Sequence, residues 1–201
     1  MRMSILDNGH GCDTPGKRSP VWEDGSYLQE WKYCRAIVKK IAQGLKEAGI
    51  PNHILVPEDH DIPLRTRVQR ANKIAAQYGI SQTLLISVHL NAAQQTNTAS
   101  GWEVHTSPGE TKSDEYARVF WETAKDLLGD KFPMRGDWED GNPDRDSNFA
   151  IIRDTACPAI LTENLFMDSE KDCRFLMSEE GEQTIVDIHV KSIVKLWLSK
   201  I

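Results

Sequence analysis

The chain has 201 residues, the size of one domain, and 27% of them are charged. This composition excludes a disordered or collagen-like chain, and no apolar run reaches the roughly 18 residues of a transmembrane helix. Lys and Arg number 24 against 30 Asp and Glu, a net charge of −6. Because nucleic acids and anionic membranes bind basic surfaces, we expect no nucleic-acid partner and no membrane insertion.

Strand and helix signals alternate along the chain, with Gly and Pro between them. In chain order, we expect a strand at 3–8, a helix at 26–48, a strand at 53–56, a helix at 63–78, strands at 83–88 and 101–106, a helix at 113–128, strands at 149–153 and 159–162, and helices at 169–178 and 182–200. Ser26 and Gln29 have the spacing of a capping box that opens the first helix.

This alternation predicts an α/β fold with a single domain over residues 1–201. We expect a mostly parallel twisted sheet of about six strands with helices on both faces, of the phosphorylase/hydrolase-like type. The run at 83–88 is apolar at nearly every position, as in a strand buried on both faces. The segment 131–148 is rich in Gly, Pro and Asp, and we expect a long irregular connection there, of a length usually associated with function or mobility.

Ionisable side chains occur where the predicted strands end. His10 follows the first strand, His89 follows the strand at 83–88, and Glu163 follows the strand at 159–162. The carboxyl ends of parallel strands meet at one edge of an open sheet, where ligands bind. Glu30 lies one turn before Cys34 on the apolar face of the first helix, which places a carboxylate near the same edge.

Two imidazoles and one carboxylate are a common zinc ligand set with an open fourth position, and a further carboxylate can act as a base. The spacing of His10, Glu30 and His89 is not diagnostic, and there is no HExxH motif. A first-turn glutamate also occurs simply because it interacts favourably with the helix dipole. The residues alone therefore leave a hydrolytic metal site and a structural role equally open.

Five segments in order resemble the catalytic domain of zinc-dependent N-acetylmuramoyl-L-alanine amidases, which include enzymes of cell-wall remodelling and phage endolysins. They are LDNGHG at 6–11, Glu30, PLRTRVQRAN at 63–72, SVHLNA at 87–92 and PAILTENLFMDSEKD at 158–172. The resemblance implies one zinc ion per chain, bound by His10, Glu30 and His89, with Glu163 as the catalytic glutamate. GWEVH at 101–105 and RGD at 135–137 match the family less closely.

The implied reaction is hydrolysis of the amide between N-acetylmuramic acid and the L-alanine of the peptidoglycan stem peptide. Glu163 would take a proton from water and deliver it to the leaving amine. We expect a muropeptide as the partner, with Asn91, Arg135 and Asn164 as candidate contacts to the substrate or supports of the site.

Three alternatives remain. Another zinc peptidoglycan peptidase or carboxypeptidase would use similar ligands, although such enzymes commonly place His and Glu within one helical turn. A non-catalytic muropeptide-binding module would keep the fold but lose a ligand or the base. A structural protein would leave Glu30 buried without a partner.

The cysteines and the first residues predict the compartment. Cys12, Cys34, Cys157 and Cys173 have no regular spacing, which is typical of reduced thiols rather than a disulfide framework. The apolar residues before Asp7 are too few for the core of a signal peptide. We expect a protein made in the cytoplasm without a signal peptide, which acts on the cell wall after lysis or release.

Overall fold

The computed structural model describes residues 1–139 and 141–199 and has a six-stranded sheet at its centre. The sheet order is β2-β1-β3-β6-β4-β5. The strands are β1 (Met3–Asn8), β2 (Asn52–Ile54), β3 (Thr83–Asn91), β4 (Trp102–Thr106), β5 (Arg145–Asp146) and β6 (Ala159–Phe166). Neighbouring strands run parallel except β4 and β6, which are antiparallel. The predicted α/β fold with a mostly parallel sheet is therefore confirmed.

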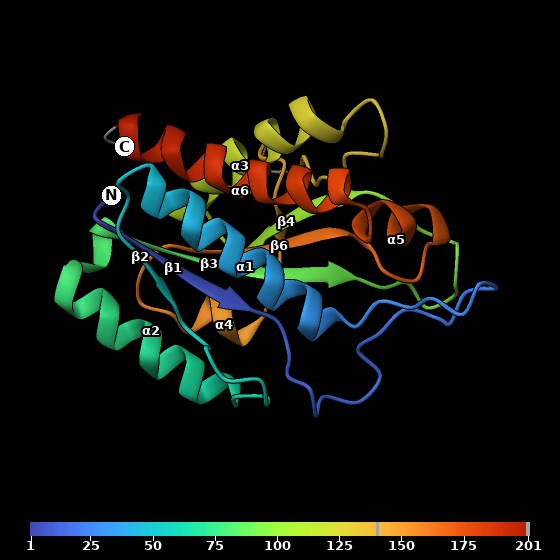
Figure 1. Cartoon of the computed structure of the whole chain (residues 1–201). Helices are drawn as coiled ribbons and strands as arrows, with labels where there is room; N and C mark the ends of the chain where they lie inside the picture. The colour runs from blue at the N-terminus through green and yellow to red at the C-terminus, as the bar shows by residue number, and fades with distance from the viewer. Residues whose placement is uncertain (140, 200–201) are drawn as a thin grey trace.

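Helices cover both faces of the sheet, as predicted (Figure 1). They are α1 (Glu30–Glu47), α2 (Leu64–Tyr78), α3 (Lys112–Leu128), α4 (Ala150–Arg153), α5 (Glu170–Leu176) and α6 (Glu179–Ser199), with a 3₁₀ turn, η1, at Ile80–Gln82. On one face, Ile86 and Val88 of β3 belong to a core shared with α1, α3, α5 and α6. On the other face, Leu85 belongs to a core shared with α2 and α4. This two-sided burial explains the continuous apolar run of β3.

The first helix begins later than predicted. Its first residue is Glu30, and Gln29 at the N-cap makes no capping hydrogen bond through its side chain. The hydroxyl of Ser26 bonds instead to Asp24 and receives a hydrogen bond from Arg174. An isolated bridge between Arg18 and Gln29 accompanies this extended approach to the helix. The predicted capping box is therefore wrong, because tertiary contacts occupy the residues that would have formed it.

The segment at 149–153 is also not the predicted strand. Residues Ala150–Arg153 form the short helix α4, whose Ile151 and Ile152 are buried against the core that includes α2. A short apolar run fits a buried strand or a buried helical turn equally well, so periodicity could not distinguish them. A strand, β5, instead occurs inside the expected irregular segment 131–148, where Asp140 lies outside the described residues. Lys200, the predicted end of the last helix, also lies outside them.

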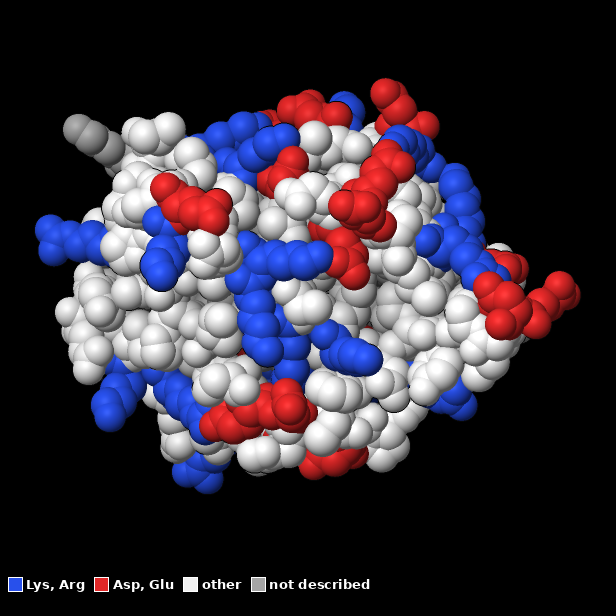
Figure 2. Space-filling view, viewed as in Figure 1, with Lys and Arg blue, Asp and Glu red and all other residues white. Residues whose placement is uncertain are grey.

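Charged groups of both signs share the surface. On the face shown in Figure 2, the Lys and Arg side chains are interspersed with those of Asp and Glu. Among the helices of the described residues, none is both long and apolar enough to cross a membrane. All four cysteines lie in the described part of the chain and are free thiols, and Cys12 alone among them is exposed.

A buried histidine links α6 to the sheet. The side chain of His189 is fully buried, with Nδ1 2.7 Å from the carbonyl oxygen of Ile185 and Nε2 3.0 Å from the hydroxyl of Thr162. This pairing fits a neutral ring that donates from Nδ1 and accepts at Nε2. Burial lowers the pKa of His189 to about 4, despite its hydrogen bond to Ile185.

We predict that His189 makes the fold less stable in mild acid. Below about pH 6.5 the unfolded chain binds a proton at His189 that the folded chain does not bind until about pH 4. Stability is therefore lost as the pH falls through this window, by about 2 kcal/mol between pH 7 and pH 5. In urea unfolding with a chelator present, the free energy of unfolding of wild type relative to that of His189→Gln should be lower at pH 5 than at pH 7 by this amount. A difference independent of pH would contradict the prediction.

Candidate active site

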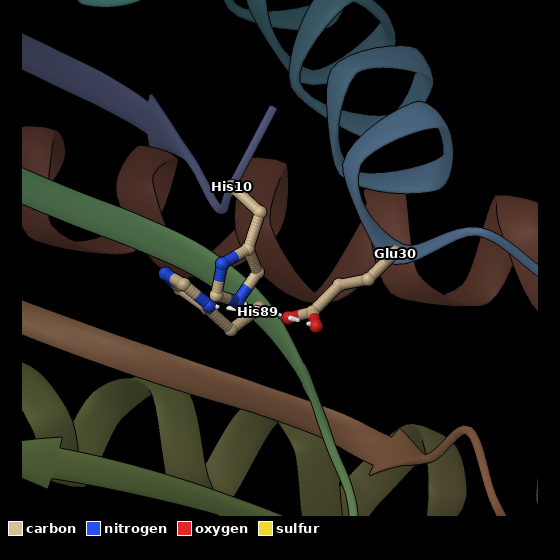
Figure 3. Close-up of side chains that lie close together, drawn as sticks. All are labelled: His10, Glu30 and His89. Atoms are coloured by element: carbon tan, nitrogen blue, oxygen red, sulfur yellow. Dashed lines mark hydrogen bonds and ion pairs between the residues drawn. The ribbon is translucent and has the colours of Figure 1, made fainter. Parts of the chain in front are cut away.

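Three side chains from separate elements converge at the carboxyl ends of β1 and β3 (Figure 3). His10 follows β1, His89 lies near the end of β3, and Glu30 is the first residue of α1. Nε2 of His10 lies 3.3 Å from Oε2 of Glu30, and Nδ1 of His89 lies 3.2 Å from Oε1. The structure thus brings together the three residues that the sequence predicts as zinc ligands.

The geometry of these atoms fits a tetrahedral metal. Zinc bonds to nitrogen and oxygen of about 2.0–2.1 Å imply about 3.3–3.4 Å between neighbouring ligand atoms of a tetrahedron. The donor atoms of the three residues all lie within 4.8 Å of one another. Oε2 of Glu30 is buried, and within the described part of the chain it has no hydrogen-bond partner apart from its contact with His10. The donor set and this carboxylate oxygen therefore suit a cation held between the three side chains.

Electrostatics keep Glu30 ionised. Its side chain is 1% exposed. Burial alone would raise the pKa of Glu30, but the hydrogen bonds and charges of His10 and His89 outweigh burial and hold this pKa well below its usual range. The backbone N–H of Leu90 donates a further hydrogen bond to Oε1, at 3.1 Å. Burial lowers the pKa of His89, but its interaction with Glu30 prevails, so the net shift is upward. The site thus holds a buried anion ready to bind a cation.

The turn after β1 brings the backbone against His89. A Cβ atom on Gly9 would lie 2.5 Å from Cε1 and Nδ1 of the His89 ring, so only glycine leaves room for this imidazole. The next residue, His10, has a φ of 58°, in the left-handed region that few residues other than glycine adopt. Two tight backbone positions in succession therefore place both imidazoles.

Two buried arginines hold this strained turn. The carbonyl oxygen of His10 accepts hydrogen bonds from Nη1 of Arg35, at 2.9 Å, and from Nη2 of Arg67, at 3.2 Å. Arg67 also donates to the carbonyl oxygen of Asn8 and forms an ion pair of 2.9 Å with buried Asp7. Arg67 belongs to the segment PLRTRVQRAN at 63–72, and the structure shows the backbone atoms that it holds. Arg35 was not singled out, because its position on a helix does not reveal a carbonyl partner 25 residues away.

Glu163 lies beside His89 in the sheet. The two residues are paired between β6 and β3, and Glu163 is also paired with Glu103 of β4. Paired residues point to the same face, so the three side chains form a row across the strands. Oε2 of Glu163 is buried and has no hydrogen-bond partner among the described residues. Burial raises the pKa of Glu163 to about 8, with the negative charges of Glu30 and Glu103 adding to the shift and His89 opposing it. A cation beside His89 would lower this pKa again.

Asn164 supports the backbone of His89. Its amide nitrogen donates to the carbonyl oxygen of His89, at 3.0 Å, and to the hydroxyl of Thr162, while its amide oxygen accepts from Nε1 of Trp102. The residue is fully buried. Asn164 is thus a neighbour that positions β3, and its side chain is not open to a substrate.

Asn91 and Arg135 meet at one carboxylate, that of Glu103. Nδ2 of Asn91 lies 2.7 Å from Oε1, and Nε of Arg135 lies 2.7 Å from Oε2. Arg145 is a further neighbour of Oε2, at 3.7 Å. Sequence reasoning did not select Glu103 or Arg145 as site residues. The pairing of Glu103 with Glu163 depends on the reversed direction of β4, which the apolar pattern does not specify.

The fold and these side chains define an α/β protein with a candidate hydrolytic metal site at one edge of its sheet. A family model described as N-acetylmuramoyl-L-alanine amidase matches residues 5–195. The chain therefore belongs to the N-acetylmuramoyl-L-alanine amidase family.

Individual relatives agree with this assignment. The chain is 29% identical over 198 residues to the N-acetylmuramoyl-L-alanine amidase CwlM of Bacillus licheniformis, covering 98% of this chain and 69% of that protein. It is 25% identical to the endolysin of Bacillus phage SPP1, covering 95% of this chain and 64% of the endolysin. The chain thus spans about two thirds of the length of these relatives. A crystal structure of an N-acetylmuramoyl-L-alanine amidase from Clostridium difficile 630 superposes with a TM-score of 0.81 at 25% identity, covering 99% of this chain and 98% of that one.

We predict that Gly9→Ala disrupts the arrangement of the two imidazoles. The added methyl group would overlap the His89 ring, so the ring must leave its present position beside Glu30. Zinc titration of the purified variant should show affinity reduced by at least about tenfold, the range seen when the groups orienting a metal ligand are lost.

Gly25→Ala is the control for this steric effect, because a Cβ atom on Gly25 meets no atom within 4 Å. The backbone of Gly25 is left-handed, with a φ of 80°, so alanine there is strained without clashing. This variant should be destabilised by about 1 kcal/mol and keep its metal affinity. Equal zinc affinities for the Gly9 and Gly25 variants would contradict the steric argument.

Proposed function

We propose that this chain is a zinc-dependent amidase that hydrolyses the bond between the lactyl carbonyl of N-acetylmuramic acid and the L-alanine of the stem peptide. The observation that carries the proposal is the convergence of His10, Glu30 and His89 beside Glu163 in a chain of this family. A non-catalytic binding module is disfavoured, because both the ligand set and the neighbouring carboxylate are present.

The three proposed ligands differ in charge, and other residues hold them in place. His10, Glu30 and His89 would hold the metal, with Glu30 supplying the one negative charge of the set. A bound zinc ion would supply Lewis acidity to the scissile carbonyl and to the attacking water. Arg35 and Arg67 keep the His10 turn in place, and Asn164 does the same for the backbone of His89. This rigid support keeps the ligand atoms at their spacing before any substrate arrives.

Glu163 would move the proton. Its carboxylate, on a partly exposed side chain beside His89, would accept a proton from the attacking water and then donate it to the nitrogen of the leaving L-alanine. Placement on a central strand, rather than on a loop, fixes the carboxylate relative to His89. The same carboxylate can therefore serve first as base and then as acid.

We predict one zinc ion per chain. Elemental analysis of protein purified without chelators should give a ratio near one, and chelation should abolish cleavage of a muropeptide, measured by mass spectrometry of the released peptide. Readdition of zinc should restore cleavage. Full activity after exhaustive chelation would refute the zinc dependence. Products cut elsewhere in the stem peptide would support the peptidase alternative.

We predict that Glu30→Gln and Glu163→Gln both lose activity but differ in metal content. Glu30→Gln removes the only anionic ligand, so it should lose zinc. Glu163→Gln should fold and keep zinc, because Glu163 is not one of the three proposed ligands, while turnover falls by about 10²–10⁴-fold. Glu115→Gln, an exposed change on α3, is the control for both assays. Zinc lost from Glu163→Gln but kept by Glu30→Gln would mean that the two roles are exchanged.

A further inference from the structure

A second group of charged residues lies one strand beyond Glu163. Its centre is Glu103 of β4, which is 5% exposed. Oε1 of Glu103 contacts Nδ2 of Asn91, at 2.7 Å, and Nε2 of His105, at 3.3 Å. Oε2 contacts Nε of Arg135, at 2.7 Å, and lies 3.7 Å from Nη1 of Arg145. Both oxygens of this buried carboxylate are therefore fully used within the protein, and Glu103 itself is not available to a ligand.

Arg135 is held at every point except its terminal nitrogens. Its backbone N–H donates to the carbonyl oxygen of Trp102, and its own carbonyl oxygen accepts from Nε1 of Trp121, both at 2.9 Å. Its guanidinium carbon lies 5.1 Å from the centre of the Phe166 ring, which supports the guanidinium group. The side chain is 35% exposed. Among the described residues, none makes a hydrogen bond or ion pair with its two Nη groups, which therefore remain for a ligand.

Arg145 adds a second guanidinium from a different element. It lies on β5, where it is paired with His105 of β4, and its side chain is 39% exposed. Its contact with Glu103, at 3.7 Å, is longer than a hydrogen bond. Two guanidinium groups thus flank the carboxylate of Glu103, which leaves one positive charge in excess within this group of three side chains. Paired guanidinium groups with free N–H donors suit a carboxylate ligand.

The chemistry of the proposed substrate identifies the source of this carboxylate. The muramoyl part has one carboxyl group, and that group forms the amide to be cleaved. Any free carboxylate near the site therefore belongs to the stem peptide. Neighbouring strands are about 4.8 Å apart, and an extended peptide advances about 3.3–3.6 Å per residue. A group on β4 or β5 is thus within reach of the residue that follows L-alanine when the scissile amide lies at Glu163.

We propose that Arg135 and Arg145 form a subsite for a free carboxylate on the second residue of the stem peptide, with Glu103 as the positioning residue that holds Arg135. This inference rests on the proposed function. It means that the peptide side of the substrate extends across β4 toward β5, and that the enzyme distinguishes a free carboxylate from its amide.

The test compares two substrates that differ only in charge. They are N-acetylmuramoyl-L-alanyl-D-glutamate with both carboxyl groups free and the same compound with both converted to amides. Wild type should cleave the acid at least about tenfold more efficiently. Arg145→Gln should lower kcat/KM for the acid by about tenfold, mainly through KM, and change the diamide by less than about twofold. Arg145→Lys should recover part of the preference, because it keeps the charge without the planar fork.

The variants have matched controls. Arg174→Gln removes an arginine of nearly the same side-chain exposure, 38%, whose partners are Asp24 and Glu170 on another part of the surface, and it should leave both substrates unaffected. Arg145→Gln breaks no hydrogen bond that the structure shows, so it should fold with an unchanged melting temperature. Arg135→Gln should lower kcat/KM for the free-acid substrate more than Arg145→Gln does. It should also lower the melting temperature, because Glu103 loses its closest cation.

A binding measurement separates this inference from the proposed function. Calorimetric titration with the product dipeptide, L-alanyl-D-glutamate, should show binding that weakens about tenfold in Arg145→Gln, whereas the diamide should bind equally to both proteins. Cleavage of neither substrate by wild type would refute the proposed function, and this titration would still test the subsite. If Arg145→Gln lowered kcat/KM equally for the acid and the diamide, or if wild type showed no preference between them, the proposed subsite would be wrong.

Discussion

The buried carboxylate of Glu30 is the group on which the arrangement of the site depends. An ion with 1% exposure is costly unless charged or polar neighbours surround it. His10, His89 and the backbone N–H of Leu90 supply those neighbours, and they come from the ends of two adjacent strands. Strands β1 and β3 and helix α1 must therefore reach the same edge of the sheet. The ion pairs themselves fix the separation of the three side chains.

The sheet then orders the rest of the chemistry by strand. Strands β1 and β3 carry the imidazoles, β6 carries Glu163, and β4 carries Glu103, each one strand further along. Because strand spacing is fixed, the metal ligands, the proposed base and the arginines around Glu103 lie in a row at set intervals. The direction of β4 decides which of its residues joins this row. Because β4 runs antiparallel to β6 and begins at this edge, its second residue, Glu103, is the one paired with Glu163.

Local pattern was sufficient for the larger elements but not for the strand ends, because β3 extends to Asn91 and β6 to Phe166, so that His89 and Glu163 lie within these strands rather than after them. The apolar run of β3 and the position of Glu163 after a second apolar run follow from chemistry within a few residues. The same reasoning failed at Ser26 and at 149–153, where contacts with distant segments decided the structure. Ser26 bonds to Arg174, and the side chains of α4 enter the core beside α2. Short segments are decided by such contacts because their own preferences are weak.

The sequence by itself determined the alternation of strands and helices, the burial of β3 and the order of the four residues His10, Glu30, His89 and Glu163. These follow from side-chain periodicity and from the rule that carboxyl ends of parallel strands share an edge. Only the tertiary structure decided how the His10 turn is held and what surrounds Glu103. Arg67 reaches the carbonyl oxygen of His10 from 57 residues away, and Arg135 reaches Glu103 from 32. The physical reason is that buried polar groups form hydrogen bonds with whichever residues the fold brings beside them. A local sequence pattern does not show which distant residues these are.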